Sequence, residues 1–425
     1  MMKMNIFLPK VTVIIPVHNT SAYLRQCLET TVNQTLSEIE IICVNDGSTD
    51  GSLEILKDFA AKDSRIVILS REHASGSAAR PRNMGLNTAK GKYVICLDSD
   101  DYFDTRLLEK LVERAEETEA DLVLCDNYVV QPDGQIINGR ELYEEYLPKE
   151  KVFSCRTMPE TFFQFTNAAP WHRLMRREMI ERYQLRYQEK TPILDDIYFV
   201  DLQMVLSERI SIIRDRLVYY RASRPGAQTT TIARHKESVF WVFQALNEGL
   251  KKHGLYAPLK FSLQNWTLQT LRWWLYMTND YRAFNELYRL YQEEYFSKLG
   301  LTDIEPDRCY GANGHFYCEI MGCGDEPPMI TLLKQETPYR IALYGAGVMG
   351  YNVRRIIETQ GRHRVTLWCD RDALRKNDSR ITLPETLKTR DFDAVTIALG
   401  SAAAAQSVTQ YLLSLGIDKR SVYAI

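Results

Sequence analysis

The regular alternation of β-branched runs and helical patterns over the first 125 residues constrains the fold more than any other feature of the sequence. We predict strands at 11–17, 39–46, 65–70, 92–98 and 120–130. Helical patterns separate them, at 22–33, 51–62, 78–90 and 105–118. Continuous apolar runs are typical of strands buried on both faces, and their alternation with helices favours a doubly wound, mostly parallel sheet. Ligands of such sheets bind at the carboxyl ends of the strands.

The length of the chain indicates more than one domain. At 425 residues, with 45% apolar and 25% charged side chains, the chain has enough apolar material for two or three cores. We predict an α/β domain at 1–230, a helical region and linker at 231–335, and a small α/β domain at 336–425. Aromatic side chains are dense between 236 and 299, and we expect them to pack between helices rather than to bind an acceptor. The stretch 300–337 is rich in Gly, Pro and acids, which predicts a linker.

Charge and cysteine usage narrow the class of protein. The formal net charge is −2, which gives no electrostatic bias toward nucleic acid or anionic lipid, so we expect no nucleic-acid partner. The nine cysteines are scattered, several of them in apolar strands, which indicates a reducing compartment rather than a disulfide framework. The N-terminal stretch does not resemble a signal peptide, and no run approaches the roughly 20 apolar residues of a spanning helix. We expect a cytoplasmic protein, with association at the inner face of the cell membrane and homo-oligomer formation both left open.

The stretch YVICLDSDDY ends a predicted strand in three closely spaced carboxylates, those of Asp98, Asp100 and Asp101. Because like charges at this spacing repel one another, we expect a cation among them. Hard oxygen ligands suit Mg²⁺ or Mn²⁺, especially an ion that also binds substrate phosphates. The alternative is a polar turn in which Asp101 or Asp104 caps the next helix. The residues alone favour the turn, because an Asp-x-Asp pair is common.

Two further polar residues stand at predicted strand ends, His18 after the first strand and Asp46 after the second. A carboxylate at such an end can accept hydrogen bonds from ribose hydroxyls or from a nucleobase N–H. The alternative for Asp46 is a turn in which the side chain caps the following helix.

Three stretches, VTVIIPVHN, EIICVNDGSTDGS and ARPRNMGLNTAKGKYVICLDSDD, together resemble the N-terminal signature of family 2 glycosyltransferases, which have the GT-A fold. The strong resemblance covers residues 10–105. A weaker one continues through APWHRLMRREMIERYQLRYQE and ILDDIYFV to LVYYRASRPG, near residue 226. His18 stands where Tyr is commonest in the family, Pro81 interrupts a stretch that usually lacks proline, and LDD replaces the more usual ED pair.

The resemblance implies roles for individual residues. The nucleotide sugar would be bound by Pro16, Val17, His18, Asp46, Arg82, Asp98 and Trp171. Asp100, together with Asp98, would hold Mg²⁺ or Mn²⁺ at the donor diphosphate. The alternatives are a surface position for Arg82 and core packing for Trp171. Tyr220 and Arg221 lie where the family often contacts the donor phosphates.

The resemblance also implies a catalytic base. In inverting transfer, a carboxylate deprotonates the acceptor hydroxyl, and the family position for this base corresponds to Asp196, with Asp195 as the second choice. The alternative is that both acids only open a helix that begins near Ile197, where negative charge favours the helix dipole.

The C-terminal stretch YGAGVMG follows a predicted strand and precedes a helix, as in dinucleotide-binding folds. Gly345, Gly347 and Gly350 would admit a phosphate, and Asp370, 25 residues after Gly345, would bind ribose. This second nucleotide site is one interpretation of a Rossmann-like module that resembles those attached to polysaccharide-biosynthesis enzymes; a purely structural or regulatory role is the other. Four possible zinc ligands, Cys309, His315, Cys318 and Cys323, match no standard spacing, which disfavours a zinc site.

The sequence thus leads to one main functional hypothesis and two alternatives. The first is a metal-dependent, inverting glycosyltransferase of the hexosyltransferase type. It would move a sugar from a nucleotide sugar, most often a UDP-sugar in the family, to a glycan or lipid-linked acceptor in surface polysaccharide biosynthesis. The second is an NAD(P)-dependent oxidoreductase that uses the C-terminal glycine-rich stretch. The third is a non-catalytic protein that binds sugar nucleotides.

Overall fold

The computed structural model describes residues 8–139, 141–222, 232, 234–323, 329–376, 378–389, 391–399 and 402–425. It divides into two compact units, Met1–Ala227 with Trp241–Ser262, and Gln228–Phe240 with Leu263–Ile425. The boundary predicted at 230/231 and the last letters of LVYYRASRPG lie outside the described residues. The predicted domain limits therefore stay predictions.

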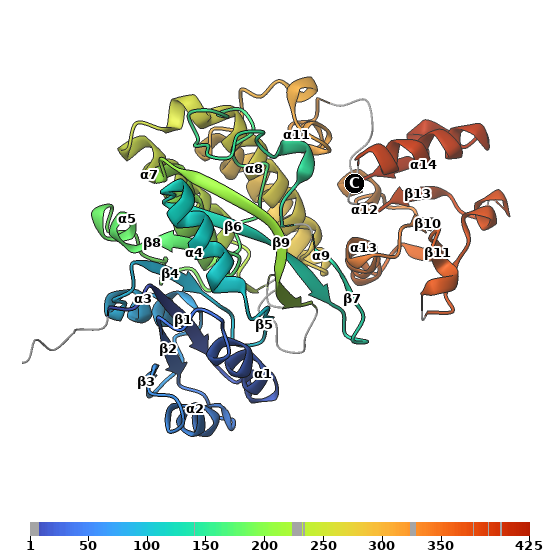
Figure 1. Ribbon diagram of the computed structural model, residues 1–425. Helices are drawn as coiled ribbons and strands as arrows, with labels where there is room; N and C mark the ends of the chain where they lie inside the picture. The colour runs from blue at the N-terminus through green and yellow to red at the C-terminus, as the bar shows by residue number, and fades with distance from the viewer. Residues whose placement is uncertain are drawn as a thin grey trace, which may run out of the picture. The chain divides into compact units, whose positions relative to one another are not determined.

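The first unit is built on one mixed sheet (Figure 1). Among its described residues the sheet has nine strands, in the order β3-β2-β1-β4-β8-β6-β9-β5, with β7 paired to β6. The strands are β1 (Val11–Val17), β2 (Ile39–Asp46), β3 (Ile66–Arg71), β4 (Tyr93–Cys96), β5 (Tyr102–Phe103), β6 (Leu122–Val130), β7 (Ile136–Asn138), β8 (Arg173–Arg176) and β9 (Ile210–Arg221). Strands β3, β2, β1 and β4 are parallel, whereas β8 runs antiparallel to β4 and β6. The predicted doubly wound α/β architecture is confirmed.

Helices cover both faces of this sheet. They are α1 (Ser21–Val32), α2 (Ser52–Ala60), α3 (Ala79–Thr88), α4 (Leu107–Thr118), α5 (Arg177–Arg182) and α6 (Asp195–Leu206). A Cβ atom at Gly85 of α3 would lie 2.4 Å from Cγ2 of Ile14, so α3 covers the Ile14 face of β1. Val13 and Ile15 pack instead in a core cluster with Leu24 of α1. Successive strand side chains point to opposite faces, so α3 and α1 lie on opposite sides of the sheet.

Several element ends differ from the predicted ones. The strand predicted at 92–98 ends at Cys96, because the backbone turns after Leu97 and the N–H of Asp101 donates to the carbonyl of Asp98 (3.2 Å). Helix α2 spans Ser52–Ala60 rather than 51–62, and α4 begins at Leu107 rather than at 105. Asp98 therefore lies in a loop, which leaves its side chain free to turn toward α3.

The second unit begins with helices whose aromatic side chains pack together. They are α8 (Tyr256–Tyr276), α9 (Tyr281–Leu290), a π-helical turn (Tyr291–Tyr295), α10 (Phe296–Lys298), α11 (Asn313–Met321) and α12 (Met329–Leu333); α7 (Ser238–Lys252) and α8 have residues in both units. Trp274, Phe284 and Tyr291 are fully buried, as expected for packing between helices.

The predicted linker at 300–337 is wrong in part, because it contains α11 and α12. Phe316 and Ile320 give α11 a buried face that the Gly-rich composition conceals.

The second unit ends in a small parallel sheet. Its strands, in the order β12-β11-β10-β13-β14, are β12 (Ile381–Thr382), β11 (Arg364–Cys369), β10 (Arg340–Tyr344), β13 (Ala394–Ile397) and β14 (Val422–Ala424). Helix α13 (Val348–Gln360) follows β10, and α14 (Ala402–Ser414) follows β13. The predicted small Rossmann-like α/β module is confirmed.

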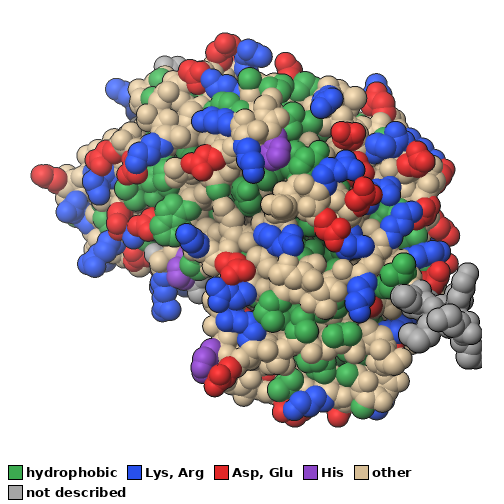
Figure 2. Space-filling view, turned by 90° about the vertical axis from the view of Figure 1, so that its left-hand side faces the viewer, with side chains coloured by type: hydrophobic (Ala, Val, Ile, Leu, Met, Phe, Trp, Pro, Cys, Tyr) green, Lys and Arg blue, Asp and Glu red, His purple; other side chains and the backbone are tan. Residues whose placement is uncertain are grey.

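The distribution of surface charge and the character of the helices bear on the class of protein. On the face shown in Figure 2, acidic and basic side chains are interspersed, in agreement with the small net charge. Within the described ranges, none of the helices combines the length and the apolar character needed to span a bilayer.

Candidate active site

The carboxyl ends of β2, β1 and β4 lie next to one another. Val17 pairs with Asn45 of β2, and Ile14 pairs with Cys96 of β4. The residues that follow these strands therefore gather at one edge of the sheet. His18 lies against the end of β2, where its Nδ1 is 2.8 Å from the carbonyl oxygen of Asp46. Because a carbonyl only accepts, the Nδ1–H tautomer donates this bond and leaves Nε2 as an acceptor.

Asp46 is 3% exposed, and both of its carboxylate oxygens are engaged. Oδ1 pairs with Nη1 of Arg71 at 2.5 Å, and Oδ2 accepts from the N–H (2.8 Å) and the hydroxyl (2.6 Å) of Ser75. Gly47 has φ +62°, and a Cβ atom there would lie 2.5 Å from the backbone nitrogen of Ala74. Asp46 therefore holds the 71–75 loop against the end of β2. No spacing pattern indicated Arg71 or Ser75 in advance.

The acidic run after β4 divides into residues with different surroundings. Asp98 is half-buried and accepts from Nη2 of Arg82 (2.8 Å). Asp101 is 1% exposed and its Oδ1 accepts from the N–H of Arg221 (2.8 Å). Burial, together with the neighbouring Asp100 and Asp98, raises the pKa of Asp101 well above its usual range. Asp101 thus joins the run to β9, whereas the Asp100 side chain is half-buried.

Arg221 stabilises the same turn from the opposite strand. Its guanidinium donates to the backbone carbonyl of Asp100 and to the side chain of Gln26. It also lies 4.8 Å from the ring centroid of Tyr102 and 5.2 Å from that of Tyr23. A cation in contact with two aromatic faces and a carbonyl is well fixed.

Arg82 is the central cation of the cluster. It is 5% exposed, which excludes the surface position considered from the sequence. Its Nη2 bonds Asp98, its Nη1 lies 3.6 Å from Oδ2 of Asp195, and its guanidinium lies 5.3 Å from the ring centroid of Tyr187. Burial alone would lower the pKa of Arg82, but the two carboxylates raise it well above its usual range. One side chain thus joins the Asp98 loop to the start of α6.

Tyr187 and Asn83 fix the position of α3 beside this cation. Asn83 Nδ2 donates to the Tyr187 carbonyl (2.9 Å), and the Tyr187 N–H donates to Asn83 Oδ1 (2.8 Å). The Tyr187 ring also stacks on Phe199 of α6, with centroids 4.0 Å apart. The sequence did not predict a role for Tyr187, because it is separated from Asn83 by more than a hundred residues.

Asp195 and Asp196 form the first turn of α6, which begins at Asp195 rather than near Ile197. Leu194 before them has φ +62°, a left-handed conformation that is uncommon for a non-glycine residue and is concentrated at functional sites. Asp195 is 4% exposed, and burial raises its pKa to about 7 despite the opposing effect of Arg82. Asp196 is half-buried; desolvation also raises its pKa, again against Arg82. The more accessible of the two carboxylates is Asp196.

Trp171 occupies the hydrophobic core. It is 4% exposed and stacks on Tyr220, with ring centroids 5.5 Å apart and an interplanar angle of 12°. This is the packing alternative considered from the sequence. The neighbouring Arg173 is fully buried and donates through Nη2 to the carbonyl of Asn167 (2.7 Å).

The donor set suits a divalent ion shared with a substrate. Within the described ranges, no group of three or more His, Cys, Asp or Glu side chains is arranged as a metal centre, which includes the cysteines near 309–323. Asp98 and Asp100 instead supply two carboxylates on one turn. Mg²⁺ is commonly bound by one or two carboxylates that it shares with substrate phosphates. The residues present therefore fit an ion that is completed by a diphosphate.

The remaining predicted site residues divide between the two units. Pro16 and Val17 are the last two residues of β1, and Pro16 pairs with Val44. Gly345, Gly347, Gly350 and Asp370 belong to the second unit, after β10 and β11. The second unit thus contains the glycine-rich stretch and Asp370, whereas the first unit contains Pro16, Val17, His18, Asp46, Arg82, Asp98, Asp100, Trp171, Asp195 and Asp196.

Comparisons with known proteins point to one family. Residues 12–184 match the family described as Glycosyl transferase family 2. The uncharacterized glycosyltransferase EpsJ of Bacillus subtilis is 33% identical over 50% of this chain and 61% of its own length, so the match spans less than two thirds of that relative. The cholesterol galactosyltransferase of Borreliella burgdorferi is 30% identical over 71% of this chain and 86% of its own length.

The crystal structure of S. aureus TarS 1-349 in complex with UDP covers 74% of this chain and 90% of its own, with a TM-score of 0.45 and 20% identity. The family match, the galactosyltransferase relative and the mixed sheet together support one conclusion. The chain belongs to glycosyltransferase family 2 and has the GT-A fold.

Proposed function

We propose that the chain is a metal-dependent, inverting glycosyltransferase that transfers a sugar from a nucleotide sugar to a hydroxyl of a glycan or lipid-linked acceptor during surface polysaccharide synthesis. The observation that carries the proposal is the bridge made by Arg82. It joins Asp98, in the loop after β4, to Asp195, at the start of α6. The residues that would bind the leaving diphosphate and the residues that would activate the acceptor thus surround one buried cation.

Asp196 is the proposed general base. Its half-buried carboxylate would take the proton of the acceptor hydroxyl while that oxygen attacks the anomeric carbon of the donor. The bond between the sugar and the diphosphate breaks on the opposite side, so the configuration inverts. The raised pKa of Asp196 makes its ionised form a better proton acceptor than an exposed carboxylate.

Asp195 has a different proposed role. It is buried and its carboxylate faces the guanidinium of Arg82, so it would position that cation rather than exchange protons with the acceptor. Arg82 in turn would stabilise negative charge that develops on the leaving diphosphate. Asp100, with Asp98, would hold Mg²⁺ or Mn²⁺, which supplies further positive charge for the same leaving group.

The nucleotide would bind along the ends of β1 and β2. The Nε2 atom of His18 is an acceptor once Nδ1 donates to Asp46, and the loop held by Asp46 would form a wall of the base site. A UDP-sugar is the donor we expect first. The Borreliella relative is named a cholesterol galactosyltransferase, and an acceptor of lipid character there supports a lipid-linked acceptor here.

The proposal is tested by following release of nucleoside diphosphate from a panel of UDP- and GDP-sugars, with Mn²⁺ or with EDTA. We expect one donor to be turned over, and we expect EDTA to abolish that turnover. Asp100→Ala should lower it by about 100-fold or more, because it removes a metal ligand. Asp133→Ala, an exposed acid in a turn, is the matched control and should leave the rate unchanged. If wild type with EDTA and Asp100→Ala with Mn²⁺ both turned over the donor as fast as wild type with Mn²⁺, transfer would not use a metal at this turn.

A further inference from the structure

A cavity of about 540 Å³ lies in the second unit, at the carboxyl ends of three parallel strands. Tyr344 and Gly347 line it after β10, residues 370–372 line it after β11, and Ala398 and Leu399 line it after β13. Its volume is within the range of small-molecule sites, about 300–1,000 Å³. None of these residues belongs to the first unit, so the cavity is separate from the proposed transfer site.

The cavity lies where the strand order reverses. β10 is the central strand, the chain passes from it to β11 on one side, and β13 pairs with its other side. In open parallel sheets such a reversal leaves a crevice between the loops that leave the two central strands in opposite directions. Here those are the loops after β10 and β13, and both line the cavity.

Two of the three glycines after β10 are explained by packing within the protein. Gly345 has φ +108°, and a Cβ atom there would lie 2.4 Å from the carbonyl oxygen of Ala398. A Cβ atom at Gly350 would lie 2.1 Å from the carbonyl oxygen of Gly345. Any side chain at either position would push the loop away from the sheet or from the helix.

Gly347 has no such explanation. Its φ of −83° and ψ of −175° are open to every residue type, and a Cβ atom there would meet no described heavy atom within 4 Å. Gly347 also lines the cavity. A side chain is therefore missing at the one position where it would occupy the cavity instead of the protein core. Close approach of a ligand to the backbone accounts for this choice.

The lining has groups for both the phosphate and the ribose of a nucleotide. Helix α13 has 13 residues, Gly347 is its N-cap, and among the described residues no side chain caps it. Its first N–H groups are thus directed at the cavity. Arg371 and Lys376 add positive charge to the lining. Asp370 binds the loop through Oδ2, which accepts from the N–H of Ala346 (2.6 Å), and each oxygen has a second lone pair for a ribose hydroxyl.

An apolar wall completes the cavity. Trp273, in the last turn of α8, and Met277, the residue after its end, line it together with Leu399. Trp273 and Met277 are both half-buried. Aromatic stacking on a base tolerates any base, since every base has a π-face.

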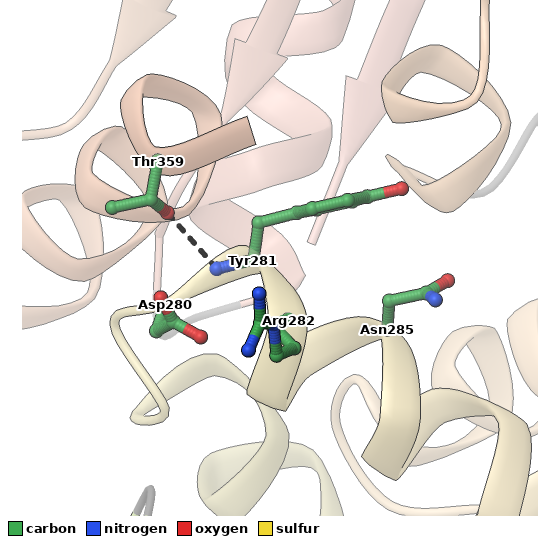
Figure 3. Close-up of a pocket in the computed structure, with 5 residues that line it drawn as sticks. All are labelled: Asp280, Tyr281, Arg282, Asn285 and Thr359. Carbon is green, nitrogen blue, oxygen red and sulfur yellow. Dashed lines mark hydrogen bonds between the residues drawn. The ribbon is translucent and has the colours of Figure 1, made fainter. Parts of the chain in front are cut away.

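A second cavity of the same unit, of about 500 Å³, has no glycine and no tryptophan among its described lining residues (Figure 3). It is lined by Asp280, Tyr281, Arg282, Asn285 and Thr359. Asp280 caps α9 by accepting from the N–H of Ala283 (2.9 Å), and the hydroxyl of Thr359 accepts from the N–H of Tyr281 (2.9 Å). Its polar groups serve the packing of α9 on α13.

We propose that the cavity after β10 is a second ligand site, which binds the diphosphate of a nucleotide against the start of α13. Asp370 binds the ribose, Arg371 and Lys376 neutralise the phosphates, and the wall formed by Trp273 receives the base. A nucleoside diphosphate and a dinucleotide share this chemistry, and they are distinguished by using UDP and NAD⁺ as separate probes. The site does not depend on the transfer reaction.

The test is isothermal titration of the full chain with UDP and with NAD⁺, in wild type and in Gly347→Val. Valine is compatible with the backbone at 347 and fills the cavity. We expect wild type to bind one probe or both at this site. In Gly347→Val, that binding weakens by about tenfold or more, since contacts to a charged diphosphate are lost. UDP can also bind in the first unit, so for UDP we expect Gly347→Val to bind one equivalent fewer per chain than wild type. Binding of NAD⁺ identifies a dinucleotide site, and binding of UDP alone a mononucleotide site.

A second pair of variants keeps the proposal open to refutation if Gly347→Val fails to fold. Lys376→Gln removes a charge from the lining and should weaken binding by about fivefold. Lys388→Gln, an exposed lysine of the same unit outside the lining, should have no effect. The proposal is overturned if neither probe binds, or if stoichiometry and affinity are the same in the folded lining variants as in wild type.

Discussion

Arg82 is the residue on which the geometry of the proposed transfer site depends most. A buried guanidinium requires compensating charge, and Asp98 and Asp195 provide it from two segments that are distant in sequence. Removal of the cation leaves two acids that repel each other at low solvent exposure. Loss of Arg82 should therefore change the protonation of the acids as well as the binding of the diphosphate.

The pH dependence of transfer tests this relation. A general base acts only when ionised, and burial raises the pKa of Asp196 and brings that of Asp195 to about 7. We predict that kcat/KM falls as the pH is lowered through the raised pKa of the Asp195–Asp196 pair, rather than near pH 4. Arg82 lowers the pKa of both acids, so Arg82→Met should move this acid limb to higher pH and reduce kcat by about 100-fold.

Arg80→Met is the matched control for this prediction. Arg80 lies on the same helix but is exposed and pairs with Glu189, so its loss should leave the acid limb in place. The measurement is a pH–rate profile of the three proteins on an accepted donor. An acid limb at the same pH in wild type and in Arg82→Met would show that Arg82 does not control the base.

At this scale the sequence placed several acids but not their partners. Asp46 and Asp98 were expected at one edge of the sheet because the carboxyl ends of parallel strands gather there, whereas the metal-binding role of Asp98 and Asp100 came only from the resemblance to the family. Arg71, Ser75 and Tyr187 could not, since their contacts join loops whose paths are set only by tertiary packing.

Among the elements, helix α3 controls the site because it carries Arg82. It packs closely on β1 at Gly85, where a Cβ atom would lie 2.4 Å from Ile14. We predict that Gly85→Ala destabilises the protein by about 1–3 kcal/mol through overpacking, and that it also lowers turnover because Arg82 moves with the helix. Thermal unfolding and the turnover assay measure the two effects.

Gly51→Ala is the control for this substitution. The nearest described atom to a Cβ at Gly51 is 3.9 Å away, on Ser21, and a glycine-to-alanine change there should alter stability by less than about 1 kcal/mol. If Gly85→Ala were as stable and active as Gly51→Ala, close packing of α3 would not be what positions Arg82.

Over residues 11–130 the types and order of the main strands and helices followed from hydrophobic periodicity, whereas their ends did not. β4 stops at Cys96 because the Asp98–Asp101 turn is held by Arg82 and Arg221, which no local pattern encodes. Helix α11 was missed because Gly and Pro dominate the composition around it, and its apolar face of Phe316 and Ile320 is short.

In the whole molecule, the second unit contains a titratable group apart from both proposed sites. Glu319 of α11 accepts from the hydroxyl of Tyr276 (2.7 Å), and burial raises the pKa of Glu319 to about 7 although Tyr276 and Arg272 lower it. At pH values between the usual pKa of a glutamate and about 7, Glu319 is protonated in the folded state and ionised in the unfolded state. The stabilisation present at low pH is therefore lost as the pH rises through about 7.

Glu319→Gln isolates this effect, since an amide oxygen can still accept from Tyr276. We predict that the variant equals wild type in stability near pH 5 and exceeds it near pH 8, by on the order of 1–3 kcal/mol. Glu336→Gln, an exposed acid of the same unit, should follow wild type at both pH values. The melting temperatures of the three proteins at the two pH values measure this difference. An equal pH dependence of the melting temperature in wild type and in Glu319→Gln would contradict the prediction.

The proposed transfer uses a base in α6 beside the acids of the loop after β4. Its most direct test is the rate of nucleoside diphosphate release from an accepted donor in Asp196→Asn, with donor binding measured in parallel. We predict a rate lower by about 100- to 10,000-fold with donor affinity retained, because only proton removal is lost. Asp58→Asn, an exposed acid of α2, should turn over at the wild-type rate. A folded Asp196→Asn protein that turns over donor as fast as wild type would contradict the account.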